Sequence, residues 1–187
     1  MEIYLITKNK GKVLAAQSVF SKFGIIVKNI EKDYPEIQAN TSMEIAKYTA
    51  LQAAKEFNVP VVREDHSLFI AALGGFPGPY TNYFDKTIPA EKILELIKDS
   101  KDKTAYMEVA AAYAKPDGEI KEYVFKVPLQ ISKEIRGNIR NWDRILMIQA
   151  TDKTFAESTE EENVGIWDKN YLAIAKDIVK ESKKIKN

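Results

Sequence analysis

The sequence contains no cysteine, and His66 is its only histidine. The absence of cysteine excludes disulfides, zinc sites with thiolate ligands and cysteine nucleophiles. A single histidine also excludes metal sites built from several imidazoles and any relay between two histidines. Chemistry in this chain therefore has to come from carboxylates, Lys, Arg, Tyr, Ser or Thr, and a bound metal ion is the natural partner of the carboxylates.

Long hydrophobic runs and an excess of one charge are also missing. The first residues, Met1–Ile6, are apolar but too short and too acidic for a signal peptide, and no stretch reaches membrane-spanning length. The formal net charge is only +1. We therefore expect a cytoplasmic protein that binds neither a membrane nor nucleic acid.

The amino-terminal third has the pattern of a parallel α/β unit. Ile3–Ile6 predicts a short buried strand, and residues 7–12 form a polar turn. Apolar residues at helical spacing follow over 13–23, and Ile25–Ile30 predicts a second strand. Strand, loop, helix and strand in this order are the unit from which parallel sheets are built.

The next segment predicts a helix and a strand before the regular pattern breaks. Thr41 and Glu44 have the spacing of a capping box, which marks a helix start. Val59–Val62 predicts a strand that leads into the polar residues 63–67. Three glycines and two prolines within residues 74–80 then exclude regular structure there.

The second half predicts a helix, a hairpin and a closing helix. Pro89–Ile97 has helical apolar spacing. Thr104–Ala114 and Glu119–Ile131 predict an antiparallel hairpin, because a Lys-Pro-Asp-Gly turn joins them. Ile145–Ile148 predicts a short strand, and a last helix is expected from about Glu161 to Lys180.

The first polar turn is a candidate phosphate site. Thr7, Asn9 and Lys12 lie where a strand ends and a helix begins, and free backbone N–H groups and the helix dipole favour an anion at such a point. The glycine-rich P-loop pattern is absent, which excludes a Walker-type nucleotide hydrolase. An ordinary polar turn explains the same residues when they are taken alone.

A second candidate is the carboxylate set Glu36, Glu64 and Asp65. Oxygen ligands suit Mg²⁺, which one or two carboxylates and substrate phosphates usually hold, and the ion can activate a water molecule. Because strand side chains alternate, only one of Glu64 and Asp65 points into a given cleft unless the strand has already ended. A pair of solvated acids at a strand end is the competing interpretation.

The glycine- and proline-rich segment is a third candidate. Its stiff backbone would hold Phe76 or Tyr80 against a ligand, or it is only a structural turn. His66 follows Asp65 directly and would form a hydrogen-bonded pair with it, although a surface or structural histidine fits equally well.

Four segments, in this order, match motifs of one known family. They are Thr7-x-Asn9-x-x-Lys12, then Tyr34-Pro35-Glu36-Ile37-Gln38, then Glu64-Asp65 followed by Leu73-Gly74-Gly75-Phe76-Pro77-Gly78-Pro79-Tyr80, and finally Thr154-Phe155-Ala156-Glu157. Together they resemble the inosine triphosphate pyrophosphatases. Because the segments span nearly the whole chain in the right order, the resemblance is specific for the fold.

The resemblance implies a fold and an activity. The fold is an elongated, two-lobed α/β architecture with a twisted mixed central sheet, flanking helices and a deep central cleft, formed by one domain over residues 1–187. Family members are homodimers that use Mg²⁺, with Mn²⁺ as an alternative ion. They hydrolyse a nucleoside triphosphate to the monophosphate and pyrophosphate, and prefer noncanonical purine nucleotides such as inosine and xanthosine triphosphates.

The resemblance also assigns roles to individual residues. Asp65 would orient or deprotonate the attacking water with support from Glu64, and Glu36 and Asp65 would bind the metal. The remaining site residues would bind the substrate: Thr7, Asn9 and Lys12 the phosphates, and Trp142 and Asp143 the base. Phe76, held against the ligand by its stiff segment, and Lys169, which would partly restore the positive charge of the missing family residues, complete the predicted substrate-binding set.

Several positions depart from the family pattern, mainly in the base pocket. Trp167-Asp168-Lys169 stands where the family has Ser-His-Arg, and Arg140-Asn141 stands where it has Phe-Gly. Positions that are usually cationic are here Leu51, Asn82 and Asn163. We therefore expect an altered base specificity. There are two alternatives: a non-catalytic nucleotide-binding or regulatory protein, and an interaction module with a vestigial cleft.

Overall fold

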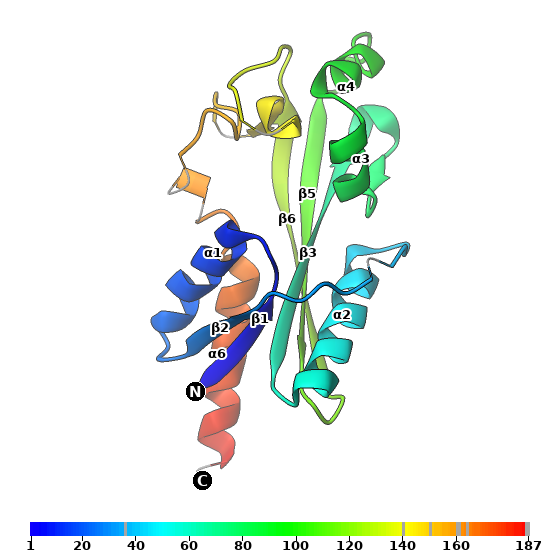
Figure 1. Ribbon diagram of the computed structural model, residues 1–187. Helices are drawn as coiled ribbons and strands as arrows, with labels where there is room; N and C mark the ends of the chain where they lie inside the picture. The colour runs from blue at the N-terminus through cyan, green and yellow to red at the C-terminus, as the bar shows by residue number, and fades with distance from the viewer. Residues whose placement is uncertain (36, 140, 150, 160–161, 164, 186–187) are drawn as a thin grey trace.

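The computed structural model describes residues 1–35, 37–139, 141–149, 151–159, 162–163 and 165–185. A curled mixed sheet runs through the molecule in the strand order β2-β1-β3-β5-β6-β7, and β4 pairs with β3 off this path (Figure 1). The predicted α/β class with a mixed central sheet and flanking helices is thus confirmed. Within the described ranges, no helix is both long and apolar enough to cross a membrane.

The predicted parallel unit forms the amino-terminal part of the sheet. β1 (Glu2–Ile6) pairs in parallel with β2 (Ile26–Ile30), and α1 (Lys10–Ser21) connects them. Asn9 is the N-cap of α1, because its side chain accepts a hydrogen bond from the backbone N–H of Lys12. Cap and turn therefore use the same residues that the sequence marks as a phosphate site.

Helix α2 (Ser42–Phe57) begins with the predicted capping box between Thr41 and Glu44. Its buried side carries four alanines, and these pack against small residues of the sheet: Ala46, Ala50, Ala53 and Ala54 on the helix, and Val61, Ala112 and Ala114 on the strands. Because these side chains are short, the helix lies close to the sheet, and a larger side chain there would overpack the contact.

Strand β3 (Val61–Ile70) is much longer than the predicted strand Val59–Val62. The predicted strand end at Val62 is wrong, because every residue of β3 is paired with β5 (Thr104–Ala114). Pairing with a neighbouring strand satisfies the backbone polar groups, and this outweighs the low strand propensity of the charged side chains. The acidic pair consequently lies in the middle of a strand.

The predicted hairpin is confirmed. β5 pairs with β6 (Ile120–Ile131) along its whole length, and β6 pairs with β7 (Leu146–Ile148) at its far end. The long strands β3, β5 and β6 give the molecule its elongated shape, with α1, α2 and α6 at one end and α3 and α4 at the other (Figure 1). The site described below lies between these ends.

The end that carries α3 is built from short elements. η1 (Ala71–Leu73), β4 (Pro77–Gly78) and α3 (Thr81–Thr87) follow β3, and α4 (Ala90–Leu96) agrees with the predicted helix. No strong start signal marks α3 in the sequence, because its N-cap residue makes no capping hydrogen bond through its side chain.

The last helix, α6 (Lys169–Ile185), starts later than the predicted Glu161, a residue outside the described ranges. Gly165 and a turn precede it, in which the N–H of Ile166 donates to the carbonyl of Asn163. The turn places Trp167 just before the helix. Tyr171, Ile174 and Ala175 of α6 are fully buried against the sheet.

Candidate active site

The alternation of β3 separates Glu64 from Asp65. Glu64 faces one side of the sheet together with His66, whereas Asp65 faces the other side, where α2 packs. Two cavities result. We call them the Asp65 cavity, of about 560 Å³, and the Glu64 cavity, of about 830 Å³. The expectation that only one of the two acids points into a given cleft is therefore met within a continuous strand.

The first loop joins the two cavities. Lys8, Asn9 and Lys12 line both of them. The backbone N–H of Asn9 donates to Thr7 Oγ1 over 3.1 Å, and the ammonium of Lys12 donates to the carbonyl of Glu64 over 3.0 Å. The loop is thus fastened to β3, with its polar groups between the cavities.

The Asp65 cavity is lined by many charged side chains. Its cations are Lys8, Lys12, Lys32, Arg63 and Lys86, and its acids are Asp33, Asp65, Asp85 and Asp143. Thr7 lies at its wall as well. Cations attract a polyphosphate, while carboxylate and hydroxyl oxygens are the donors that Mg²⁺ prefers. The donor set therefore fits a magnesium ion shared between protein and phosphate.

No group of three or more metal-ligating acids or histidines occurs among the described residues. This is compatible with Mg²⁺, because the ion is usually held by one or two carboxylates and completes its shell with water and substrate oxygens. Glu36, the other predicted metal ligand, lies outside the described residues. Its role stays a prediction.

Glu64 is buried in a hydrogen-bonded network. It is 2 % exposed, and its Oε2 accepts from His66 Nε2 at 2.8 Å and from the hydroxyl of Tyr171 at 3.1 Å. Burial alone would raise the pKa of Glu64, but the nearby His66, Lys12 and Tyr171 outweigh burial and lower it. The carboxylate therefore stays ionised.

His66 is the neutral partner in this network. Burial lowers the pKa of His66 and Lys12 adds to the effect, although Glu64 opposes it. A neutral imidazole facing a carboxylate has to donate from Nε2. The histidine therefore pairs with Glu64 rather than with Asp65, which alternation places on the other face of β3.

An aromatic wall closes the Glu64 cavity. Trp167 lies 5.1 Å from the His66 ring and 5.8 Å from the Phe155 ring, measured between centroids. All three side chains line the cavity, together with Asn163, whose buried Oδ1 has no hydrogen-bond partner among the described atoms. The wall and this acceptor would suit a flat heterocycle that carries N–H groups.

Trp142 and Asp143 lie on η2 (Trp142–Arg144), in the segment between β6 and α6. Trp142 is 2 % exposed and its indole N–H donates to the carbonyl of Ile88, so little of its surface is open to the Asp65 cavity. Asp143 lines both cavities. Contact of this pair with the base stays a prediction, and the geometry favours Asp143 for it.

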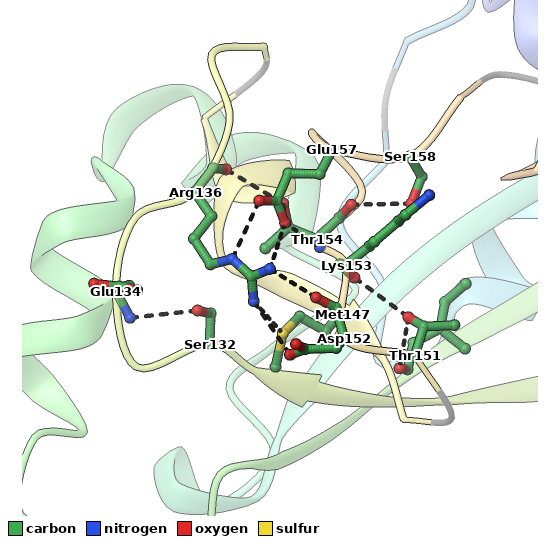
Figure 2. A network of polar contacts seen from close by, with 11 residues as sticks. Ser132, Glu134, Arg136, Met147, Thr151, Asp152, Lys153, Thr154, Glu157 and Ser158 are labelled. Atoms are coloured by element: carbon green, nitrogen blue, oxygen red, sulfur yellow. Dashed lines mark hydrogen bonds and ion pairs between the residues drawn. The ribbon is translucent and has the colours of Figure 1, made fainter.

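Arg136 makes several polar contacts within the segment between β6 and α6 (Figure 2). Its guanidinium bonds to the carbonyl of Asp152 at 2.6 Å and to the carboxylate of Glu157 at 3.1 Å. Glu157 in turn accepts from the backbone N–H of Thr154 at 2.9 Å. The network therefore joins Arg136 to residues 152–157, the loop that carries Phe155.

The comparison with known proteins agrees with this arrangement. Residues 3–170 match the model of the Ham1 family. The chain belongs to the Ham1 family. Similar relatives are the dITP/XTP pyrophosphatase of Methanopyrus kandleri, 36 % identical, with 89 % of each chain covered, and that of Thermococcus kodakarensis, 38 % identical, with 87 % of this chain and 88 % of the relative covered.

Solved structures agree with the Ham1 fold. A HAM1 protein from Coxiella burnetii matches with a TM-score of 0.78 at 25 % identity, covering 97 % of this chain and 99 % of that one. The Staphylococcus aureus Ham1 protein matches with a TM-score of 0.77 at 26 % identity, covering 98 % and 100 %. Membership of the predicted family is thus confirmed.

Two predicted substrate contacts are not brought to the cavities of this Ham1 family member. Phe76 packs edge-on against Phe84, 4.6 Å between ring centroids, and lines neither cavity. Lys169 is exposed, with its ammonium 5.5 Å from the Phe125 ring, and it also lines neither cavity. Both side chains contact aromatic residues that lie outside the two cavities.

Among the cavity residues that are absent from the predicted site are Arg63, His66 and Trp167. A strand that ends at Val62 gives no definite side to Arg63 and His66, and only the longer β3 places them on opposite faces of the sheet. Trp167 was visible only as a departure from the family pattern.

Proposed function

We propose that this chain is a nucleoside triphosphate pyrophosphatase that converts a nucleoside triphosphate to the monophosphate and pyrophosphate with Mg²⁺. The observation that carries the proposal is the pair of cavities joined at the first loop. The Asp65 cavity carries five cations and four acids beside its aromatic residues, and the Glu64 cavity is the more apolar of the two and carries the rings of Phe155 and Trp167, which suits a nucleotide with a charged chain and a flat base. Relatives that cover most of the chain are named dITP/XTP pyrophosphatases.

The polyphosphate chain occupies the Asp65 cavity. Lys12 is anchored at the shared edge by its bond to the carbonyl of Glu64, and Thr7 and Asn9 add short polar groups at the start of α1. A helix N-terminus favours an anion, and charge-assisted hydrogen bonds hold phosphate oxygens. Phosphate binding at this loop fits its position between the cavities.

Mg²⁺, held by Asp65 and Glu36 together with substrate oxygens, would neutralise charge on the phosphates and help to position the attacking water. Mn²⁺ would serve as an alternative ion. Asp65 accepts a proton of the water as its oxygen bonds to the α-phosphorus, and the bond from the α-phosphorus to the oxygen that bridges it to the β-phosphorus breaks, so that pyrophosphate leaves. Glu64 has no contact with this water, because its carboxylate lies on the opposite face.

The base occupies the Glu64 cavity. Trp167 offers a ring face for stacking, and the free acceptor of Asn163 suits the ring N–H of a deaminated purine, an N–H that adenine lacks. Substrates of the inosine and xanthosine type therefore fit this wall, with a preference altered by Trp167.

The fold acts as one domain in a homodimer, and sedimentation analysis of the pure protein tests this state.

A pyrophosphate-release assay on a panel of nucleoside triphosphates, with Mg²⁺ and with Mn²⁺, tests the proposal. We expect turnover of inosine- or xanthosine-type triphosphates well above that of ATP. If no triphosphate is turned over with either ion, hydrolysis is excluded. Nucleotide binding in calorimetry would then support a non-catalytic binding protein, and no binding would support an interaction module.

A further inference from the structure

Arg63 lies two residues before Asp65 and on the same face of β3. Its partner across the sheet is Ala112 and that of Asp65 is Ala110, so a methyl group lies directly opposite each of the two charged side chains on β5. Residues two apart on a strand are separated by about 7 Å. Both side chains line the Asp65 cavity.

The guanidinium of Arg63 is only partly satisfied by the protein. Its Nη1 donates to the carbonyl of Ile6 at 3.0 Å, which fixes the side chain at the end of β1, directly before Thr7. Its Nε is buried and has no hydrogen-bond partner, and none of the ion pairs described for the chain includes Arg63. A half-buried cation without an anion is unfavourable, because burial removes hydration that nothing replaces.

Two lysines of the same cavity, Lys8 and Lys32, differ from Arg63. Lys8 pairs with Asp33 at 2.6 Å, and Lys32 pairs with Glu56, and both lysine side chains are well exposed to water. Their charges are neutralised on the surface. Arg63 instead keeps an uncompensated charge and a fixed donor deeper in the wall, beside the carboxylate proposed to act on water.

We propose that Arg63 binds a phosphate group of the substrate, as a cation supplied by β3 in addition to Lys12 of the first loop. A guanidinium is always ionised at neutral pH, and its planar fork matches two oxygens of one phosphate. The bond to the Ile6 carbonyl holds the fork in place before the ligand arrives. This inference rests on the proposed function, because it adds a contact at the phosphate end of that same site.

Binding of inorganic tripolyphosphate, measured by calorimetry, tests the contact without any turnover. We expect Arg63→Met to weaken binding by about 10- to 100-fold and Arg63→Lys to weaken it less, because lysine keeps the charge but loses the fork. Lys47→Met is the matched control: Lys47 is a partly exposed cation on α2 that pairs with Glu122 and lines neither cavity. The Lys47→Met variant should bind tripolyphosphate with the affinity of the wild type.

A merely structural role predicts a different result. In that case Arg63→Met lowers the melting temperature but leaves tripolyphosphate affinity within about twofold of the wild type, since the loss would not depend on ligand charge. That outcome overturns the proposal. If Arg63→Met does not fold, Arg63→Lys decides instead, and a tripolyphosphate affinity of Arg63→Lys equal to that of the wild type also overturns the proposal. Because the measurement needs no hydrolysis, its failure is distinguishable from failure of the proposed enzymatic function.

Discussion

Glu64 and His66 share a hydrogen bond of 2.8 Å on the face of β3 opposite Asp65. Adjacent acids that look equivalent in the sequence are therefore separated by the backbone into different environments. Glu64 is enclosed by Tyr171 and His66, whereas Asp65 faces a cavity with cations. We assign a structural task to Glu64 and a chemical task to Asp65.

The first prediction concerns the stability of this network. Glu64→Ala should lower the free energy of unfolding by about 3 kcal/mol, because it removes the buried acceptor of two hydrogen bonds. Tyr171→Phe removes only one of those bonds and should cost about 1 kcal/mol. Urea unfolding measures both values. Equal stability of Glu64→Ala and the wild type would contradict the network.

The second prediction concerns base preference. Trp167→Ala removes the ring that faces His66, so KM for the preferred purine triphosphate should rise about tenfold, while tripolyphosphate affinity stays unchanged. Trp167→Phe keeps a ring and should restore most of the affinity. The KM values over a nucleotide panel are the readout. A uniform loss for all ligands, tripolyphosphate included, would mean that Trp167 only supports the fold.

The third prediction concerns acid stability at the far end of α6. Hydrogen bonds from Lys121 and then Lys115 hold the pKa of Glu181 below its usual value of 4.5. A carboxyl with a lowered folded pKa stabilises the fold above its unfolded pKa, and this contribution disappears as pH falls through the folded pKa. Glu181→Gln should therefore be less stable than the wild type at pH 7.

Thermal unfolding between pH 7 and pH 3 measures this difference. The gap between the two melting curves should shrink below about pH 4.5. Lys47→Met is the control, because Lys47 pairs with Glu122 outside this network. The difference in melting temperature between Lys47→Met and the wild type should not show the pH dependence expected for Glu181→Gln. A gap for Glu181→Gln that is constant with pH would exclude the titration of Glu181 as its cause.

Most of the fold follows from local patterns in the sequence. The capping box of Thr41 and Glu44, the turn at residues 115–118 and the amino-terminal α/β unit all form as predicted, because each depends on nearby residues. Strand β3 does not follow in this way. Its charged residues 63–66 have low strand propensity, and only pairing with β5, far along the chain, keeps them extended.

The candidate site is predictable to a smaller extent for the same reason. The first loop and Asp65 meet at one cavity as expected. The burial of Glu64 depends on Tyr171, more than a hundred positions away, and the place of Trp167 depends on the turn before α6. Such contacts between distant segments have no signature in local spacing.

The most direct test of the account is pyrophosphate release by the wild type and Asp65→Asn, assayed in parallel with an inosine-type triphosphate and Mg²⁺. Asp65 is assigned the proton of the attacking water, so the asparagine variant should keep its fold while kcat falls by about 10²- to 10⁴-fold. A folded Asp65→Asn variant with wild-type kcat would contradict the account.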